Sequence, residues 1–427
     1  MLCILNTAQI LQKSGNNYLT PQTITAIKSV KQHFEPTPEL LQIMETFRRM
    51  VNDCIRMGLE NDVSTRIKLT KLCYRQLSRY NIYSVYKLCA ISHAAGILAN
   101  RKKSIKRGFQ PRRPYASKSM LIAYIGFKIV DGGLRVPTGD RQYFDIPLNS
   151  YVKNILSDPI LKVRSFTLTA KNTVSICYMK EVPEIECKSL EGIDRNLNNV
   201  TIGNRQQVRQ YDLSKAVVIA ENTRSVIKSF KRNDVRIRKK LYSKYGQRRK
   251  NRVNQLLHRV SKVVVQHEKE NRTVIAFEDI RHIRKLYHRG NYQGRSYRDR
   301  LNGWSFAEVK RQIEYKARWE GIPVIQLSVK DTRGTSQFCP RCGKKIVQVD
   351  RKTRQLWCAE CKRWMDRDVV AAMNLSIKGL ARFASSKGLA GEAMVQESGS
   401  KEPVILKVDA SRLSFRLKPK ADRTQNL

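Results

Sequence analysis

Long runs of apolar residues are missing from this chain of 427 residues. No segment reaches the roughly eighteen consecutive apolar residues that a membrane-spanning helix needs. The opening residues, Met-Leu-Cys-Ile-Leu-Asn, lack a basic leader and a long apolar core, so we expect no secretory signal. Both absences predict a cytoplasmic protein that is not secreted and has no membrane partner.

Acidic residues are also scarce. The chain has 36 Asp and Glu against 82 Lys and Arg, which gives a net charge of +46. Such a surplus repels itself strongly unless a polyanion neutralises it. Nucleic acid is the leading candidate for that polyanion, with an anionic membrane surface as the weaker alternative. We therefore expect a nucleoid-associated protein that binds nucleic acid.

The cysteines form no disulfide framework, and only four of the ten follow a pattern. The other six are scattered, as in a reducing compartment. Four sulfur ligands in two Cys-x-x-Cys pairs suit a closed, structural zinc site. The predicted ligands are Cys339, Cys342, Cys358 and Cys361. The segment between the pairs predicts a hairpin, Ile346–Val349 and Gln355–Trp357, and hence a zinc ribbon. Two disulfides or four free thiols are the alternatives.

The first half of the chain changes pattern near residue 120. A strand over Thr23–Phe34 is followed by helical periodicity at Glu39–Asn61, Ile67–Leu77 and Val85–Leu98. This periodicity predicts a helical bundle. Short alternating runs from Met120 to Val182 predict a small, barrel-like β domain instead.

Two groups of cations are candidate phosphate contacts. The first lies on a Gly- and Pro-containing segment that we expect to be unhelical: Arg101, Lys102, Lys103, Lys106, Arg107, Arg112 and Arg113. The second surrounds a break expected near Tyr245-Gly246-Gln247 in a basic helical pair over Arg224–Glu270: Lys239, Lys240, Arg248, Arg249 and Lys250. A solvated surface is the alternative for each group, and the total charge favours nucleic acid.

Three carboxylates stand out by their context. Asp194 lies within an apolar strand, Glu278 ends a buried strand that starts at Thr273, and Asp368 begins a late helix. An edge or turn position is the alternative for Asp194. Strands that alternate with helices and carry acids at their ends describe an RNase H-like α/β core. In such a core three acids hold two Mg²⁺ ions about 3.5–4 Å apart for phosphodiester hydrolysis.

The chain resembles the TnpB (OrfB-type) proteins of insertion sequences, relatives of compact RNA-guided CRISPR nucleases. The resembling motifs are Gly192-Ile-Asp194-Arg-Asn196, Phe277-Glu278-Asp279, Trp304 with Tyr315-Lys-Ala-Arg-Trp319, Thr335-Ser-Gln337, both cysteine pairs, and Asp366-Arg-Asp368-Val-Val-Ala-Ala-Met-Asn374. They follow the family's order over roughly residues 187–383, and together they are highly specific.

The resemblance implies an RNA-guided DNA endonuclease encoded by a transposable element. Its guide RNA, derived from the transposon end, would pair with double-stranded target DNA beside a short flanking motif. Asp194, Glu278 and Asp368 would be the catalytic RuvC acids with Mg²⁺. The zinc module would be structural and would help to place the DNA strand near the cut site.

The fold class that we expect is multidomain α+β and α/β. The expected parts are a strand with a helical recognition lobe (1–119), a wedge-like β-barrel (120–186), an RNase H-like RuvC nuclease (187–338 and 362–383) with an inserted zinc ribbon (339–361), and a disordered tail (384–427).

One position departs from the family pattern. The family usually reads Asp-x-Asn-Ala-Ala after the last acid, and Val370 takes the asparagine position here. This departure predicts a missing hydrogen bond near the metal site and weakened activity. The main alternative is a guide-RNA-dependent DNA-binding repressor with weak or no nuclease activity. A strand-joining transposase and a basic structural protein of a ribonucleoprotein are less favoured.

Overall fold

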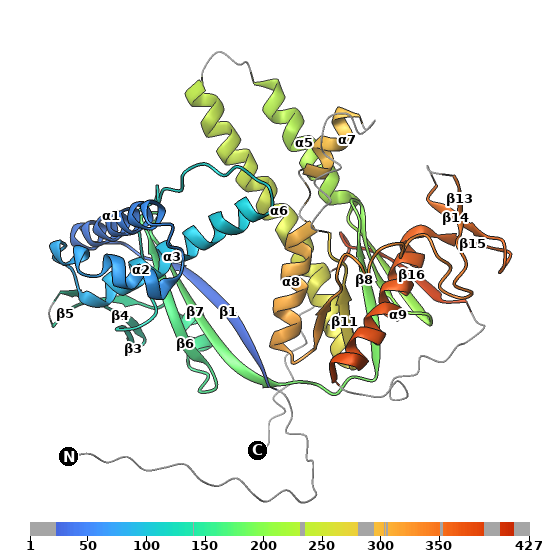
Figure 1. Ribbon diagram of the computed structural model, residues 1–427, viewed down its shortest axis with the longest axis horizontal. Helices are drawn as coiled ribbons and strands as arrows, with labels where there is room; N and C mark the ends of the chain where they lie inside the picture. The colour runs from blue at the N-terminus through green and yellow to red at the C-terminus, as the bar shows by residue number, and fades with distance from the viewer. Residues whose placement is uncertain are drawn as a thin grey trace, which may run out of the picture. The chain divides into compact units, whose positions relative to one another are not determined.

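The computed structural model describes residues 23–139, 141–230, 235–280, 294–302, 304, 306–350, 353–387 and 402–413 (Figure 1). The chain divides into two compact units, which we treat separately. One comprises Thr25–Glu181, and Val182–Leu427 belong to the other.

The first unit combines a helical bundle with two small antiparallel sheets. Its elements are β1 (Thr23–His33), α1 (Pro38–Glu60), α2 (Arg66–Cys73), the 3-10 helix η1 (Gln76–Arg79), α3 (Ser84–Lys106), β2 (Met120–Ala123), β3 (Lys128–Val130), β4 (Gly133–Gly139), β5 (Gln142–Pro147), α4 (Ser150–Leu156), β6 (Lys162–Thr169) and β7 (Thr173–Pro183). The sheets have the orders β1-β7-β6-β2 and β3-β4-β5. The predicted strand, helices and β-rich region are confirmed, while barrel-like closure stays a prediction.

Helix α1 shows why the bundle forms where the periodicity predicted it. The Thr37 hydroxyl caps the helix by accepting from the Leu40 N–H at 3.3 Å, and Pro38 occupies the first turn. One apolar face, including Met44 and Phe47, is fully buried. The expectation of an unhelical segment from Arg101 is wrong, because α3 continues to Lys106 before Gly108 takes a positive φ of 80°.

The second unit contains a six-stranded mixed sheet. Its elements are β8 (Ser189–Arg195), β9 (Asn199–Gly203), β10 (Gln207–Asp212), α5 (Ser214–Ser229), α6 (Val235–Glu270), β11 (Thr273–Phe277), α7 (Arg295–Asn302), α8 (Phe306–Trp319), β12 (Val324–Gln326), β13 (Val347–Asp350), β14 (Gln355–Cys358), β15 (Arg363–Asp366), α9 (Arg367–Lys387) and β16 (Val404–Asp409). The sheet order is β12-β11-β8-β9-β10-β16.

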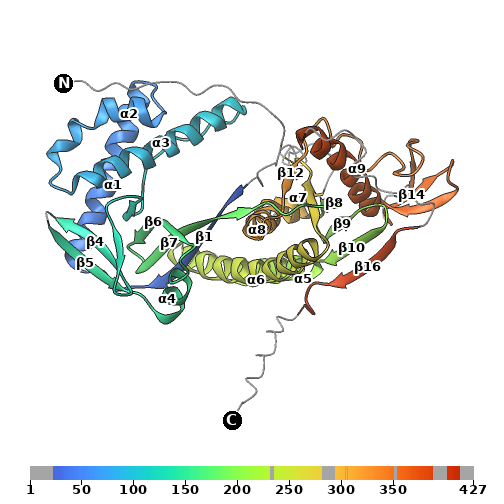
Figure 2. The same ribbon diagram turned by 90° about the horizontal axis from the view of Figure 1, so that it is seen from below.

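Helices cover both faces of this sheet (Figure 2). The strand β11 divides its side chains between two cores. Ile275 and Phe277 pack with residues of α6 and α8, whereas Val274 and Ala276 pack with residues of α9. This is the alternation expected of a strand buried on both faces, and it explains why β11 reads as an unbroken apolar run.

The long basic helix differs from its prediction. We expected a break near Tyr245-Gly246-Gln247, but α6 runs through that point for 36 residues, and the preceding helix α5 ends at Ser229. A single glycine costs a helix about 1 kcal/mol. The buried stripe that includes Leu257, Val260 and Val264 outweighs that cost.

The prediction of a disordered tail is wrong for two stretches. Helix α9 extends to Lys387, and β16 pairs in parallel with β10 from Gln207↔Val404 to Asp212↔Asp409. Local pattern gave no signal for β16, because most of its side chains are exposed and only the backbone pairing holds it. Residues 388–401 and 414–427 of the predicted tail, like residues 1–22, lie outside the described residues. None of the helices that the structure describes is long and apolar enough to span a membrane.

Candidate active site and metal centre

The sheet brings Asp194 and Glu278 to neighbouring strand ends. Strand β8 carries Asp194 as its sixth residue, and it pairs in parallel with β11 so that Ile193 lies opposite Phe277. Adjacent strands are about 4.8 Å apart. The next residues along each strand, Asp194 and Glu278, are therefore neighbours, and by alternation both belong to the face that α9 covers.

Helix α9 supplies the third acid. Its N-cap is Asp366, whose Oδ1 accepts from the backbone N–H groups of Asp368 at 2.8 Å and Val369 at 3.2 Å. The Gln210 amide also donates to this oxygen at 3.4 Å. Asp366 is thereby committed to capping, which leaves Asp368, 3% exposed, as the acid that points toward the sheet site.

Glycine lets α9 lie directly on β8. A Cβ atom on Gly192 would come within 2.4 Å of the Ala372 carbonyl oxygen and 2.6 Å of the Ser376 nitrogen. Real Cβ atoms essentially never approach backbone so closely. Ala371 and Ala372, which are small, are buried at this contact. The distance between Asp194 and the start of α9 therefore depends on the missing side chain at Gly192.

A network of amides and one arginine joins the acids. The Asn196 amide donates to Asp194 Oδ2 at 2.6 Å, and the Asn199 amide donates to Asp368 Oδ2 at 3.1 Å. The guanidinium of Arg354 pairs with Asp368 Oδ1 and donates to Asn196 Oδ1 at 3.3 Å. Asp194 and Asp368 thus belong to one hydrogen-bonded cluster.

Glu278 is held by Arg195. The backbone N–H of Arg195 donates to Glu278 Oε1 at 3.3 Å, and the Arg195 guanidinium donates to the Glu278 carbonyl at 2.8 Å and the Phe306 carbonyl at 3.2 Å. This buried arginine therefore fixes the ends of β8 and β11 and the start of α8 together.

The electrostatics of the acids favour a cation. Burial raises the pKa of Asp194 well above its usual range, and the charges of Glu278 and Asp368 raise it further. Burial also raises the pKa of Glu278, partly opposed by Arg195. The charges of Glu278 and Asp368 thus act on the buried Asp194, and a neighbouring cation would stabilise the three carboxylates together.

The acids do not converge on a single point as they stand. Their ligand oxygens do not all lie within 4.8 Å of one another. Carboxylate oxygens are the hard ligands that Mg²⁺ prefers, so the donor set suits that metal.

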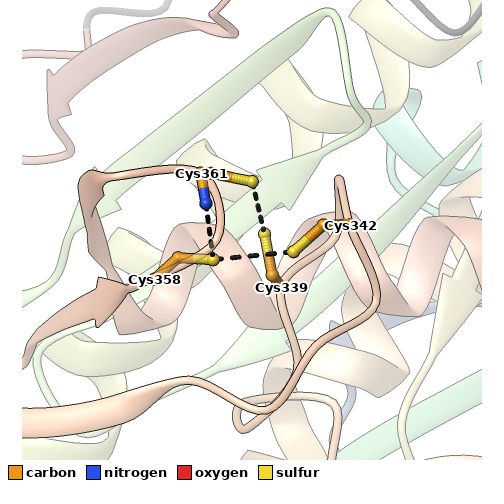
Figure 3. Close-up of side chains that lie close together, drawn as sticks. All are labelled: Cys339, Cys342, Cys358 and Cys361. Carbon is orange, nitrogen blue, oxygen red and sulfur yellow. Dashed lines mark hydrogen bonds between the residues drawn. The ribbon is translucent and has the colours of Figure 1, made fainter.

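The four predicted cysteine ligands converge on one point (Figure 3). All four Sγ atoms lie within 4.8 Å of one another, with Cys339 to Cys361 at 3.8 Å and Cys342 to Cys358 at 3.6 Å. A tetrahedron with Zn–S bonds of about 2.3 Å has sulfur atoms about 3.8 Å apart. The cysteines are not joined as disulfides, so the geometry fits a zinc ion.

The segment that carries the cysteines forms a three-stranded sheet that is larger than the predicted hairpin, and Cys358 is the last residue of β14. Strands β13 and β14 match the prediction, and β15 adds a third strand beyond the boundary expected at residue 361. Val370 of α9 is fully buried in the apolar core of this ribbon. The residue that departs from the family pattern therefore has a packing role, and Asn199 supplies an amide beside Asp368 instead.

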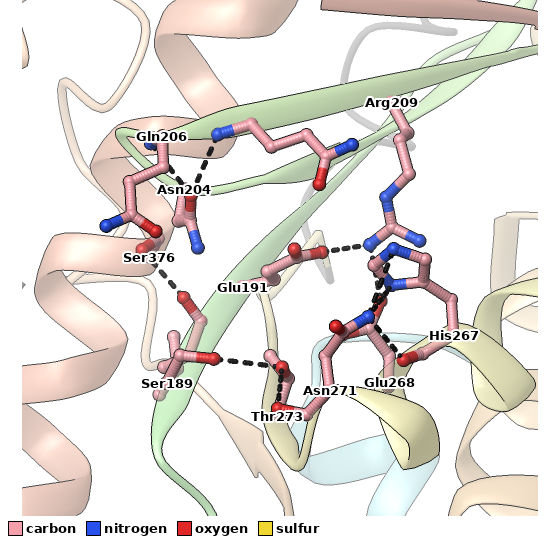
Figure 4. Close-up of polar contacts among 12 residues, drawn as sticks. Ser189, Glu191, Asn204, Gln206, Arg209, His267, Glu268, Asn271, Thr273 and Ser376 are labelled. Carbon is pink, nitrogen blue, oxygen red and sulfur yellow. Dashed lines mark hydrogen bonds and ion pairs between the residues drawn. The ribbon is translucent and has the colours of Figure 1, made fainter. Parts of the chain in front are cut away.

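A second acidic group is already neutralised from within the chain. Glu191, His267 and Glu268 lie close enough to share an ion, but Arg209 occupies their centre (Figure 4). Its guanidinium pairs with Glu191 and lies 2.6 Å from Glu268 Oε1. Burial and then Glu191 raise the pKa of Glu268, which Arg209 opposes. This cluster ties β8, β10 and the end of α6 together, and we assign it a structural role.

The predicted nucleic-acid contacts lie on two helices and one coil. Arg101, Lys102, Lys103 and Lys106 lie in the last turns of α3, Arg107 is its C-cap, and Arg112 and Arg113 follow in exposed coil. Lys239, Lys240, Arg248 and Lys250 are exposed on α6, and Arg249 is half-buried. The two groups belong to different units, so each stays a separate prediction.

Sequence reasoning missed the roles of Arg354, Asn199 and Arg209. Arg354 lies in the turn before β14 with a positive φ of 56°, which is unusual for a residue with a side chain. Only its contact with Asp368 identifies it. Arg209 lies between Val208 and Gln210 in β10, and a charge inside a buried strand is the one signal that could have found it.

Known proteins resemble the chain in sequence and in fold. A family model described as Cas12f1-like, TNB domain, matches residues 306–375. A TnpB-like protein of Methanocaldococcus jannaschii is 30% identical over 264 residues, which cover 58% of this chain and 91% of that protein. The CRISPR-associated endodeoxyribonuclease Cas12f1 of Sulfoacidibacillus thermotolerans is 30% identical over 128 residues, 30% of this chain and 27% of that protein.

A solved structure shares the fold. The cryo-EM structure of a Cas12f1–sgRNA–target DNA complex superimposes with a TM-score of 0.54 at 12% sequence identity. It covers 80% of this chain and 83% of that chain. At this identity the likeness shows a common fold alone.

Proposed function

Because this chain belongs to the family of TnpB-like proteins, we propose that it is an RNA-guided DNA endonuclease of the RuvC type, encoded by a transposable element. It would cleave target DNA next to a short flanking motif by two-metal phosphodiester hydrolysis. A relative of 30% identity carries the name of an endodeoxyribonuclease, which supports the nuclease class.

The observation that carries this proposal is the gathering of three distant acids. Asp194, Glu278 and Asp368 come from β8, from the residue after β11 and from the start of α9. The charges of Glu278 and Asp368 raise the pKa of Asp194, although 174 residues separate Asp194 from Asp368. A protein that only bound nucleic acid would have no use for three acids gathered at one site, because they repel a polyanion.

The residues present suit hydrolysis of a phosphodiester. Magnesium ions, when bound, would activate water and stabilise the leaving oxygen. Asp194, Glu278 and Asp368 would provide the oxygen ligands, and Asn196 and Asn199 would orient two of those carboxylates. Arg354 would present a guanidinium whose planar donors also suit a phosphate oxygen.

The remaining parts would hold nucleic acid. We assign a guide RNA from the transposon end and double-stranded target DNA as partners, because the net charge of +46 requires polyanions. The helical lobe and the wedge-like β region would read the flanking motif. The RuvC-like region, 187–338 and 362–383, would cut, with the zinc ribbon supporting Asp368.

The experiment combines guide identification with a matched substitution. RNA that copurifies with the protein is sequenced, and the complex is then given a matching DNA library in Mg²⁺. We expect cleavage at sites that share a flanking motif. Asp194→Asn should reduce cleavage at least about 10³-fold, since bound metal supplies several kcal/mol to the transition state.

The control is Glu360→Gln, which removes an exposed acid of the ribbon and should cleave like the parent. DNA binding by Asp194→Asn should stay close to that of the parent. If binding fell as far as cleavage, Asp194 would be structural. If the parent protein cleaved fully without RNA, guidance would be excluded.

A further inference from the structure

A cavity of about 310 Å³ lies between three helices of the second unit, and its lining includes neither the three acids nor the four cysteines of the sites above. Its walls come from α5, α6 and the residues at the start of α8. The volume is at the small end of the range for ligand pockets, and it is of the size that one nucleotide needs. Two of its lining residues, Arg249 and Lys250, are candidate phosphate contacts, but no role proposed above uses the cavity itself.

The charge of the lining is positive. Arg249 and Lys250 of α6 contribute two cations to the lining. Glu308 is the only acid among the lining residues. Glu308 is already engaged, since its carboxylate accepts from Arg311 at 2.6 Å and from Gln312 at 2.9 Å. Burial lowers the pKa of Arg249, and the nearby charge of Arg224 lowers it further. Arg249 and Lys250 together favour an anion in the cavity.

The rest of the lining suits a planar group. Trp304 is half-buried, with its indole ring edge-on to Phe306 at 6.2 Å between centroids. Asn254 contributes an amide, and Ala216 and Val253 give an apolar floor. Aromatic side chains stack with unpaired bases, and amides recognise base edges.

Gly246 leaves space in the α6 wall of the cavity, because it has no side chain. A Cβ atom added to Gly246 would meet nothing within 4 Å, although this residue lies inside a long helix. Glycine lowers helix stability relative to alanine. Neither a turn nor a close backbone contact requires Gly246 here, and because Gly246 lines the cavity, a large side chain at this position would have room to enter it.

We propose that this cavity binds a single unstacked nucleotide of the nucleic acid that the protein carries, with its base against Trp304 and its phosphate at Arg249 and Lys250. The inference rests on the proposed function for the presence of nucleic acid. The same nucleotide chemistry occurs in guide RNA and in single-stranded DNA, so the experiment has one arm for each.

The test fills the cavity through its open wall. The full chain and its variants Gly246→Trp and Gly246→Ala are titrated against a fluorescein-labelled single-stranded RNA, and separately a DNA, of about 12 nucleotides. Gly246→Trp occupies the cavity, and Gly246→Ala changes the helix but leaves the cavity open. We expect Gly246→Trp to lose roughly 5- to 150-fold in affinity, the range for one stacked base, and Gly246→Ala to bind like the parent.

Two further variants separate the base from the phosphate. Trp304→Leu should weaken binding without changing the dependence of affinity on salt, because stacking releases no counterions. Arg249→Gln should reduce that dependence by about 0.7 in the slope of log affinity against log salt, as one phosphate contact predicts. Thermal unfolding of each variant checks that the helices are intact.

Loss in the RNA arm alone assigns the nucleotide to the guide, loss in the DNA arm alone assigns it to DNA, and both outcomes support the proposal. Equal affinity of Gly246→Trp and Gly246→Ala in both arms would overturn it. Failure of the proposed function would look different, because the parent chain would then cleave no DNA while filling the cavity still weakened oligonucleotide binding.

Discussion

The ribbon site and the acid site of this chain are assembled in opposite ways. The four cysteines come from one stretch, Cys339–Cys361, and are brought together by hairpins that this stretch forms itself. Asp194, Glu278 and Asp368 come from elements spread over the whole second unit and depend on strand register and on one close helix contact. The first site is a property of a motif, and the second is a property of the complete sheet.

The difference predicts how each site fails. The ribbon site, which is built locally, should be lost when one of its own ligands is replaced, while the six-stranded sheet stays folded. The acid site should also be lost when residues that contact none of the acids are replaced, because small displacements of β8, β11 or α9 separate the acids. The two sites also meet, since Arg354 reaches Asp368 from the turn before β14, and the Asn374 amide of α9 donates to the carbonyls of Thr335 at 2.7 Å and Phe338 at 2.8 Å.

The largest effect should come from removing a zinc ligand. Cys339→Ser should abolish zinc binding, and zinc contributes on the order of 10–16 kcal/mol to the folding of small zinc modules. Zinc content by mass spectrometry should fall from one ion per chain to none. Proteolysis should increase around residues 339–366 while the six-stranded sheet stays resistant. Cys187→Ser, outside the ribbon, is the matched control, and unchanged zinc in Cys339→Ser would refute the ribbon.

A smaller effect should follow from breaking the buried charge cluster on the opposite face of β8. Arg209→Leu leaves Glu191 and Glu268 without their cation and should lower the free energy of unfolding by about 3–5 kcal/mol. Arg135→Leu breaks an exposed pair with Asp145 and should cost at most about 1 kcal/mol. Urea denaturation measures both. Equal losses would show that the cluster does not support the sheet.

The same variant should change the pH dependence of stability. The pKa of Glu268 is raised from its ordinary value of 4.5 by burial and by Glu191, so the folded protein holds this proton more tightly than the unfolded chain. Its contribution is therefore complete below that ordinary value and is lost as the pH rises through the raised value. Arg209 opposes the rise of this pKa, so without Arg209 the loss of stability with rising pH should be larger. Arg209→Leu should therefore be nearer to parental stability at mildly acidic pH than at neutral pH.

An intermediate effect should follow from adding one methyl group between β8 and α9. Gly192→Ala places a Cβ against the backbone of Ala372 and Ser376 and should cost about 1–3 kcal/mol by overpacking. Cleavage should fall as well, because α9 carries Asp368. Gly96→Ala, in α3 where the added Cβ meets nothing within 4 Å, should stabilise by about 0.5–1 kcal/mol. If Gly192→Ala were as stable as the parent, the close contact between β8 and α9 would not be what holds these two elements at their distance.

The smallest effect should come from the helix cap. Asp366→Ala removes the acceptor of two N–H groups at the start of α9 and should cost about 0.5–2 kcal/mol, whereas Asp366→Asn keeps a capping oxygen and should recover most of it. Thermal unfolding measures the difference. If Asp366→Asn were as inactive in cleavage as Asp194→Asn, Asp366 would be a metal ligand and not a cap.

The sequence predicted what is local and missed what is long-range. The helices of the first unit, the strands β8 and β11 and the cysteine hairpin all follow from period and spacing. Strand β16 could not be found in this way, because its pairing with β10 is between backbones and most of its side chains face solvent. The break expected at Gly246 failed because burial of one helix face outweighs a single weak helix former.

The acids were found by their unusual context, but their partners were not. Arg354 and Asn199 become visible only when β9, the ribbon turn and α9 are seen together. The packing role of Val370 likewise depends on a core that joins two sequence segments. Side chains that contact residues of other elements have no local sequence signature. A sequence pattern therefore predicts the acids but not the side chains that orient them.

The central claim is that the three distant acids form one site for divalent cations. Titration of the purified chain with Mn²⁺, followed by electron paramagnetic resonance, tests it without requiring guide or target. We predict that Asp194→Asn and Glu278→Gln each weaken Mn²⁺ binding at least about tenfold, the lower end of the effect of losing even an outer partner of a metal site, and that Glu360→Gln binds like the parent. Equal Mn²⁺ binding by all four proteins would contradict the account.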